Sequence, residues 1–539
     1  NESFATWLGN KITDQVFPEY SIAVTNVRAV EGAMATDAQQ SARAIRQPVT
    51  NEVQLLQAAD GLTYQKGMAV LGMFENWMGE DLFRKTILAY VKENAWGNAV
   101  AADLWSSMSE ASGVDVGTAM STFLDQPGVP LLSVNDLGDG KIALHQERFT
   151  NYGARSNKMA QSWQLPVVLR YSDGKQVRTL RTLLSSSDET LDLPTKGKLQ
   201  WIHPNDDERG YYHWDVDPQI LSRLSEDAVE IMNPRERVAF VGQVSALLDA
   251  GRIDGGSYLK VIANLADDPR PEVISAMTGA MAKVRIAFVT PELEDAFAAY
   301  VSKMLGPARE RFGLRPKKGE SDAAALLRPS LIGWLGKYAH DEEVVAYAKS
   351  VTEAYLDGQG TPDPSVLGQC MQIAALDGGW RLYNKYKKGF EEAKVPAERA
   401  RFLAGLGWFT EPAMIQHALY YSLHGDLRPQ EIFTIPMGIG RNGDEESTKI
   451  LWNWMTENYD ELMKKMPPMF AVYMPYFAGG CSADRLEAAR LFFAEDGPHY
   501  VAGQEKELAK VAEAVGDCVG LREREGKAVR EYLNQVAGL

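Results

Sequence analysis

Apolar residues recur at helical spacing through residues 1–125 of the chain. Apolar residues that are three and four positions apart lie on one face of a helix, which can pack against a core. This spacing predicts helices over Tyr64–Met78 and Glu80–Asn94. A third helix is predicted over Ala101–Ala111, because Gly113 follows it and glycine commonly ends a helix. We therefore expect residues 1–125 to be mostly helical.

The apolar period changes to two at about Gln126. Short runs rich in β-branched and aromatic residues predict strands, separated by turns such as Asp139-Gly140 and Asp173-Gly174. The predicted strands are Lys141–Phe149, Trp163–Tyr171, Gln176–Leu184, Leu199–His203 and Tyr211–Val216. Strands at this spacing favour a small antiparallel β-sandwich over residues 126–217. A single sheet closed by a neighbouring domain is the alternative.

Helical segments joined by short turns of Gly, Pro, Asp and Asn fill residues 218–539. The predicted helices include Ala323–Lys337, Glu342–Leu356, Ala397–Leu406, Thr448–Met466 and Ala483–Phe493. No strict repeat emerges, yet the succession of helices predicts an α-solenoid of irregular, HEAT-like pairs. The charged stretch Arg309–Asp322 is the expected structureless connection. The fold class is thus multidomain and mainly α, with one β-sandwich.

Composition and charge narrow the class of protein. The chain is 45% hydrophobic and 24% charged, as in a globular protein. At 539 residues it is too long to fold around a single hydrophobic core. A formal net charge of −16 argues against nucleic acid or an anionic membrane as the main partner, because both require clustered Lys and Arg. No apolar run is long enough to predict a membrane span.

The cysteine count also excludes some classes. Cys370, Cys481 and Cys518 are too few for a disulfide-dense scaffold or a zinc site built from cysteines. Cys481 and Cys518 could bridge two helices in an oxidising compartment. Alternatively, both are small buried thiols, and sequence spacing does not decide between these possibilities.

Two motifs carry the candidate chemistry. The chain opens Asn-Glu-Ser-Phe-Ala-Thr-Trp-Leu-Gly, with the acid at Glu2, and Tyr64-Gln65-Lys66-Gly67 opens a predicted helix. A carboxylate at a chain start is usually solvated, and a lone tyrosine at a helix start usually packs with its hydroxyl in water. Each motif alone is therefore a weak signal.

Together and in this order, the two motifs resemble those of the M1-family zinc aminopeptidases, which are gluzincins. The resemblance implies that Glu2 is the third zinc ligand, with Phe4 and Trp7 packing its helix. In this family an H-E-x-x-H helix supplies two histidine ligands and a general-base glutamate, and the fourth zinc position stays open for water. The resemblance also implies that Tyr64 points its phenol at the zinc-bound oxygen. A phenol keeps its proton at neutral pH and can donate to the oxyanion that forms on the scissile carbonyl.

The resemblance extends over the whole chain. It implies the helical remainder of a thermolysin-like catalytic domain over residues 1–125, then the β-sandwich, then the α-solenoid. Gln146-Glu147-Arg148-Phe149, Trp163 and Gly210-Tyr211-Tyr212 resemble landmarks of the family's sandwich. The family commonly has arginine after the tyrosine pair, whereas this chain has His213. That departure concerns the sandwich and not the chemistry.

The implied activity is zinc-dependent hydrolysis of the N-terminal peptide bond of peptides with a free N-terminus. None of the seven histidines lies in an H-E-x-x-H motif. We therefore expect that motif upstream of residue 1, with its second histidine about eighteen residues before Glu2. We also expect residues 1–539 alone to be inactive, because catalytic zinc needs three protein ligands. The family's amine-binding Gly-x-Met-Glu-Asn loop would lie upstream too.

Two other classes compete with this interpretation. One is an inactive family member that serves as a peptide-binding or interaction scaffold, and the presence of both Glu2 and Tyr64 argues against it. The other is a purely structural helical-repeat protein with an appended sandwich. That second class does not explain why these two residues stand in these motifs.

Overall fold

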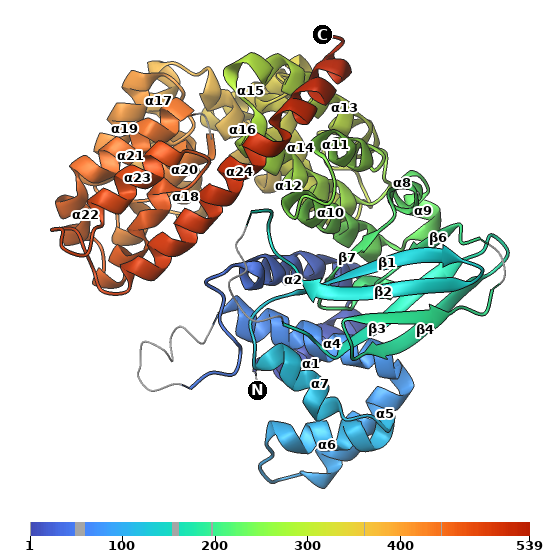
Figure 1. Ribbon diagram of the computed structural model, residues 1–539. Coiled ribbons are helices and arrows are strands. Elements are labelled where there is room, and N and C mark those ends of the chain that lie inside the picture. Colours follow the sequence, from blue (N-terminus) through green and yellow to red (C-terminus); the bar gives the residue numbers. More distant parts are fainter. Residues whose placement is uncertain (1, 49–59, 154–160, 196–197, 361, 443–444) are drawn as a thin grey trace. The chain divides into compact units, whose positions relative to one another are not determined.

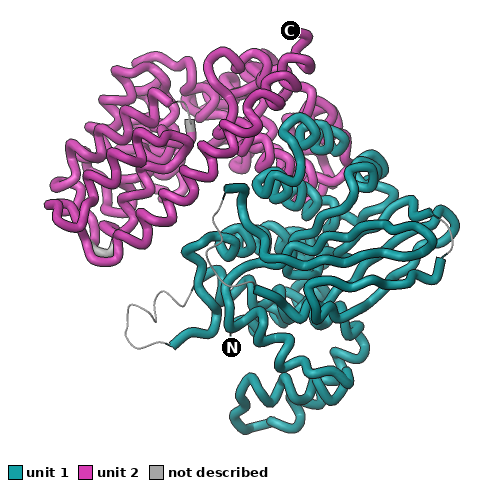
Figure 2. The backbone as a smooth tube through the Cα atoms, in the orientation of Figure 1, with its two compact units in different colours: residues 1–265 teal, residues 266–539 magenta. Residues whose placement is uncertain are grey.

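The computed structural model describes residues 2–48, 60–153, 161–195, 198–360, 362–442 and 445–539. The chain divides into two compact units, unit 1 with residues 1–265 and unit 2 with residues 266–539 (Figure 2). Each unit is described by itself below, with the element labels of Figure 1.

Unit 1 begins with helices. They are α1 (Glu2–Val16), η1 (Pro18–Tyr20), α2 (Ile22–Ala38), η2 (Leu62–Lys66), α4 (Gly67–Met78), α5 (Glu80–Glu93), α6 (Ala101–Ser112) and α7 (Val116–Leu124). Gly113 ends α6 with a left-handed φ of 72°, as its sequence position predicts. Asp115 caps α7 by accepting the backbone N–H of Thr118 at 3.0 Å. The helix predicted over Tyr64–Met78 is two elements, because η2 is a π-helical turn that continues into α4.

Strands follow the helices of unit 1. They are β1 (Pro130–Gly138), β2 (Lys141–Arg148), β3 (Leu165–Ser172), β4 (Val177–Leu184), β5 (Asp188–Asp192), β6 (Trp201–His203) and β7 (His213–Val216). They form one sheet of order β5-β2-β1-β7 and another of order β4-β3-β6, and Figure 1 shows these sheets lying one over the other. Buried Trp163 and Trp214 contribute to the core of this part. The single-sheet alternative is therefore wrong.

The predicted antiparallel arrangement needs one correction. β1 pairs with β2 in antiparallel register, but its other neighbour, β7, runs parallel to it, with Leu131 opposite His213. The four-stranded sheet is therefore mixed. β7 can pair in this direction because a long stretch of chain, which includes strands of both sheets, separates it from β1.

Helices complete unit 1 and make up unit 2. Unit 1 ends with α8 (Pro218–Glu226), α9 (Ala228–Ile231), α10 (Pro234–Asp249) and α11 (Gly255–Ala263). Unit 2 contains α12 (Pro271–Phe288), η4 (Pro291–Leu293), α13 (Glu294–Phe312), α14 (Asp322–Lys337), α15 (Glu342–Leu356), α16 (Pro364–Leu376), α17 (Trp380–Glu392), α18 (Pro396–Leu406), α19 (Pro412–His424), η5 (Pro429–Glu431), α20 (Thr434–Asn442), α21 (Glu445–Glu457), α22 (Tyr459–Lys465), η6 (Pro468–Ala478), α23 (Ala483–Phe492) and α24 (Gln504–Ala537). No helix in the described part of the chain is both long and apolar enough to cross a membrane.

Alternate helices stack through unit 2. α14 packs on α16, α16 on α18 and α18 on α20, while α15 and α17 pack beside this row. Side chains from successive helices, such as Met371 of α16, Tyr386 of α17 and Phe402 of α18, share one core. Each helix thus buries its apolar face against its neighbours along the row.

Two predicted segments of unit 2 differ from the structure. The helix predicted over Thr448–Met466 is divided into α21 and α22 at Asn458, whose side chain and backbone N–H both donate to the carbonyl of Trp454. The predicted connection Arg309–Asp322 is shorter, because α13 continues to Phe312.

A disulfide joins Cys481 and Cys518 in unit 2, with their Cα atoms 5.3 Å apart. It ties the turn before α23 to the long helix α24. Cys370 is a free, buried thiol on α16, and burial raises its pKa to about 12. Of the two possibilities that the sequence left open for Cys481 and Cys518, the structure contains the bridge.

Thiol titration tests this pairing. Under denaturing, non-reducing conditions the chain should show one free thiol, and after reduction three. The bridge closes a loop over 37 residues, so its reduction should lower the free energy of unfolding by roughly 3–4 kcal/mol. Chemical denaturation with and without reductant measures that difference. Three free thiols before reduction would exclude the bridge.

Candidate functional site

The two sequence motifs meet in the structure. Ser3, which follows Glu2, donates a hydrogen bond from Oγ to the carbonyl of Thr63 at 2.9 Å. At Gly67 a Cβ atom would lie 2.0 Å from the same Ser3 Oγ, so only glycine permits this approach of α4 to α1. Glu2 and Tyr64 are therefore held on neighbouring turns of two packed elements.

The turn that carries Tyr64 is π-helical and anchored from outside. π-helical turns are rare and occur frequently at functional sites. Asp60 Oδ1 accepts the backbone N–H groups of Leu62 at 3.0 Å and Thr63 at 3.2 Å. Arg43 binds both carboxylate oxygens of Asp60, at 3.2 and 2.5 Å, and donates to the Thr63 hydroxyl at 3.1 Å. Tyr64 itself is 37% exposed and stands on this anchored turn.

Lys66 of the same motif has a structural role. Its ammonium pairs with Asp37 of α2 at 2.7 Å, and both side chains are completely buried. Asp37 also accepts the backbone N–H of Gly128 at 2.8 Å and the Tyr211 hydroxyl at 3.1 Å. Burial lowers the pKa of Lys66, and the Asp37 carboxylate opposes that shift. Through Asp37, Lys66 thus connects η2 to α2, to Gly128 before β1 and to Tyr211 before β7.

Removing this ammonium should destabilise unit 1. Lys66→Met leaves Asp37 buried without its cation, which is expected to cost about 3–5 kcal/mol in the free energy of unfolding. Urea denaturation measures the loss, and the double variant Asp37→Leu/Lys66→Met should recover part of it. The matched control is Lys85→Met, an exposed lysine on α5, which should change stability by less than about 0.5 kcal/mol. A single variant as stable as the wild type would contradict this role.

Helix α1 is fixed on α4 through its other contacts. Trp7 is buried and donates from Nε1 to Glu75 Oε2 at 3.0 Å. Lys11 pairs with the same Glu75 and, at 2.8 Å, with Glu80. The Phe4 and Phe83 rings lie 5.5 and 5.4 Å from that of Trp7. The expected packing role of Phe4 and Trp7 is confirmed. A cavity of about 170 Å³ lies beside these contacts.

The described residues offer a zinc ion only part of a ligand set. Among them, no three His, Cys, Asp or Glu side chains lie close enough together to hold a metal ion. Glu2 lies on the first turn of α1 and is half-buried. A carboxylate in this place fits one zinc ligand. The two further ligands would have to come from other residues.

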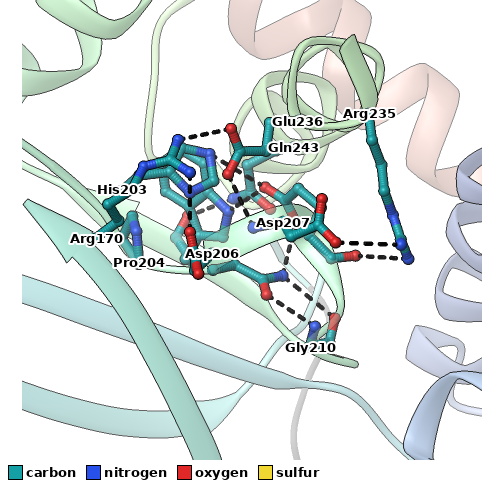
Figure 3. Close-up of polar contacts among 12 residues, drawn as sticks. Arg170, His203, Pro204, Asp206, Asp207, Gly210, Arg235, Glu236 and Gln243 are labelled. Carbon is teal, nitrogen blue, oxygen red and sulfur yellow. Dashed lines mark hydrogen bonds and ion pairs between the residues drawn. The ribbon is translucent and has the colours of Figure 1, made fainter. Parts of the chain in front are cut away.

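A largely buried polar network lies where the second sheet meets α10 (Figure 3). Arg170 of β3 binds Asp206 at 2.9 Å and Glu236 of α10 at 2.7 Å. Glu236 in turn accepts the backbone N–H of Asp207. His203 is fully buried in this network, and burial lowers its pKa. The network joins β3, η3 (Asp206–Glu208) and α10.

The family-like residues around Tyr211 also fix this turn. Asn205 accepts the backbone N–H of Gly210 at 2.8 Å, and the Tyr212 hydroxyl donates to the carbonyl of Pro204 at 2.9 Å. His213 lies with Nδ1 3.1 Å from Gln243 Oε1. These contacts agree with the expectation that His213 concerns the sandwich.

Comparison with known protein families identifies the class. The model of the ERAP1-like C-terminal domain matches residues 201–515, more than half of the chain. The model of the peptidase family M1 domain matches residues 1–123, which include both Glu2 and Tyr64. The chain therefore belongs to the M1 peptidase family.

Curated relatives agree with this assignment. The chain is 25% identical over 546 residues to "Aminopeptidase 2, mitochondrial" of Saccharomyces cerevisiae, covering 99% of this chain and 56% of the relative. It is 26% identical over 477 residues to "Aminopeptidase M1-A" of Oryza sativa subsp. japonica, covering 85% of this chain and 53% of the relative. It is 25% identical over 544 residues to "Alanine/arginine aminopeptidase" of Saccharomyces cerevisiae, covering 99% and 62%. The chain thus spans about half the length of the first two relatives.

Proposed function

We propose that this chain is the C-terminal portion of a zinc-dependent aminopeptidase that hydrolyses the N-terminal peptide bond of peptides with a free N-terminus. The observation that carries the proposal is the contact of Ser3 with Thr63 and Gly67, because it brings together the two motifs with the candidate chemistry. The names of the relatives, which are aminopeptidases, support the reaction class.

Glu2 would hold the zinc ion with its carboxylate. The first turn of α1 presents it next to the turn that carries Tyr64, and Trp7 and Lys11 keep α1 fixed on α4. Two histidines and a general-base glutamate would come from an H-E-x-x-H helix outside residues 1–539. Zinc, when bound, polarises the scissile carbonyl and makes a water molecule acidic enough to attack at neutral pH.

Tyr64 would stabilise the negative charge that develops on the carbonyl oxygen. Its phenol can donate a hydrogen bond to that oxygen. The Asp60–Arg43 pair fixes the π-helical turn, so the donor needs little reorganisation during the reaction. This preorganisation is what makes such a donor effective.

The helical part of the chain would form a solenoid. The stacking of α14, α16, α18 and α20 supports that interpretation of residues 218–539. The change from helices to strands lies between α7 and β1, and the change back lies between β7 and α8. These positions support domains over residues 1–125, 126–217 and 218–539.

The proposal is tested with the longer polypeptide that includes the residues encoded before Asn1. That polypeptide should hydrolyse aminoacyl p-nitroanilides, lose the activity on treatment with a chelator and regain it with zinc. Residues 1–539 alone should show no activity. An upstream region without H-E-x-x-H would contradict the proposed function, as would activity that a chelator does not affect.

A further inference from the structure

The cavity beside α1 and α4 is built by five elements of unit 1. Residues of α1, α2, α4, η3 and α10 line it. About 10–15 Å³ of such space holds one water molecule, so a volume of about 170 Å³ suits a molecule with on the order of ten non-hydrogen atoms. Sites for drug-sized ligands are larger. The cavity therefore has the size of a small metabolite.

Most charged side chains in the lining of this cavity already have partners. The partnered residues are Lys11 with Glu75 and Glu80, Arg209 with Asp207, and Glu208 with Trp214 and Asn205. Two further charged residues line the cavity, Arg235 and Asp14, and both keep unused hydrogen-bonding atoms. These two residues have opposite charges.

Arg235 of α10 has unused donors at the cavity. A guanidinium carries five N–H groups, and among the described residues Arg235 makes one hydrogen bond, of 3.4 Å, to the carbonyl of Glu208. Its ion pair with Asp207 spans 3.7 Å, and its Nε is buried without a partner. Figure 3 shows Arg235 at the edge of the polar network, on the side away from Arg170. A carboxylate ligand can accept two of these donors at once.

Asp14 of α1 supplies the opposite charge. One of its carboxylate oxygens accepts the backbone N–H of Ala23 at 3.0 Å, and within the described ranges the other oxygen has no hydrogen bond. Burial lowers the pKa of Arg235, and the nearby Asp14 carboxylate acts against that shift. A simple anion on Arg235 would be repelled by Asp14, whereas a zwitterion satisfies both residues.

The rest of the cavity wall is largely apolar. Trp7, Ile22, Val30 and Met68 line it. On α4, a Cβ atom at Gly72 would meet nothing within 4 Å, so the open space reaches the backbone of that helix. A ligand that fills this space needs an apolar part as well as two charges.

We propose that this cavity binds a free α-amino acid with an apolar side chain. The ligand carboxylate binds Arg235, the ammonium binds Asp14, and the side chain contacts Trp7 and Ile22. This inference goes beyond the proposed function, which adds only a source of the ligand, because each turnover would release one free amino acid. Every residue of the lining belongs to residues 1–539, so binding can be measured without the complete zinc site.

Calorimetric titration of residues 1–539 with L-leucine tests the proposal directly. Two analogues that each lack one charge, 4-methylpentanoate and 3-methylbutylamine, should bind at least about tenfold more weakly than L-leucine, because each leaves one protein charge without its partner. Failure of L-leucine to bind would overturn the proposal. Equal affinity for either analogue would also overturn it, since the site would then recognise a simple anion or a simple amine.

Two charge variants locate the binding. Arg235→Gln and Asp14→Asn each keep a polar side chain and should each weaken L-leucine binding at least about tenfold. The matched control is Arg84→Gln, at an exposed arginine of α5 that is not in the cavity lining. It should bind L-leucine as the wild type does. Wild-type affinity in both cavity variants would show that L-leucine binds elsewhere and would overturn the assignment.

A third variant fills the cavity without changing a charge. Gly72→Leu should fold, because leucine favours a helix and its Cβ meets no neighbour, and it should weaken L-leucine binding at least about tenfold by occupying the space. Gly520→Leu, in similarly open space on α24, is the matched control and should bind normally. A folded Gly72→Leu variant with unchanged affinity would contradict the proposal.

The outcome is independent of the aminopeptidase activity. L-leucine binding by residues 1–539, with no zinc-dependent activity in the longer polypeptide, would sink the proposed function and support the amino-acid site. Zinc-dependent activity in the longer polypeptide, with no L-leucine binding by residues 1–539, would do the reverse.

Discussion

Replacing Glu2 by alanine is expected to remove zinc from the longer polypeptide and, with it, the hydrolysis of aminoacyl substrates. Catalytic zinc in this class is held by three protein ligands, so the variant would retain only two. Loss of a residue that merely supports a ligand already costs 10–100-fold in affinity, and loss of a ligand should therefore cost more than about 100-fold. Metal analysis after dialysis against a weak chelator measures the zinc content.

The matched control for this variant is Glu19→Ala. Glu19 is an exposed carboxylate on η1, shortly after α1, so its removal makes the same change of charge close to the same helix. That variant should keep one zinc ion and full activity. Full zinc content in Glu2→Ala would show that another residue is the ligand.

The helices were the part of the fold most accessible from sequence. The prediction over Glu342–Leu356 coincides with α15, where Asp341 caps the first turn by accepting the N–H of Val344. Amphipathic spacing and capping residues act locally, so they can be read without the tertiary structure. The division at Asn458 was missed because it depends on one side chain that competes for a helix carbonyl.

Two strands were missed for a different reason. β5 stands at the edge of its sheet beside β2, and its sequence Asp-Glu-Thr-Leu-Asp is largely polar. Edge strands commonly carry charges that prevent further pairing, and these charges hide the apolar alternation. β1 begins at Pro130 and ends in Asn-Asp-Leu-Gly, which is typical of a turn. In both cases the pairing partner decides the structure.

The residues of the candidate site could be proposed from the sequence, whereas the contacts that support them could not. Glu2 and Tyr64 stand in motifs with a family resemblance, so the sequence singles them out as candidates. The buried pair of Lys66 with Asp37 joins residues far apart in the chain, and nothing local marks Asp37 as the partner. The Arg43–Asp60 pair that anchors the π-helical turn was missed for the same reason. Support of this kind is set by tertiary packing.

Replacing Tyr64 by phenylalanine is expected to lower kcat of the longer polypeptide by about 10²–10³, the effect of losing one oxyanion donor. The ring and the π-helical turn remain, so the variant should fold normally and bind zinc as the wild type does. KM should change little, because the lost hydrogen bond strengthens only in the transition state. Steady-state kinetics on aminoacyl substrates, with zinc content measured on the same sample, gives both quantities.

The zinc content separates this variant from Glu2→Ala. Glu2→Ala should lose metal and activity together, whereas Tyr64→Phe should lose activity and keep its metal. Tyr20→Phe, which removes the same hydroxyl from an exposed tyrosine of unit 1, controls for effects of the substitution itself and should keep full activity. If Tyr64→Phe retained near-normal kcat, the oxyanion donor would have to be another residue, and the contact of α1 with η2 would then serve only to position Glu2. If it lost zinc as well, Tyr64 would support the metal site instead of the transition state.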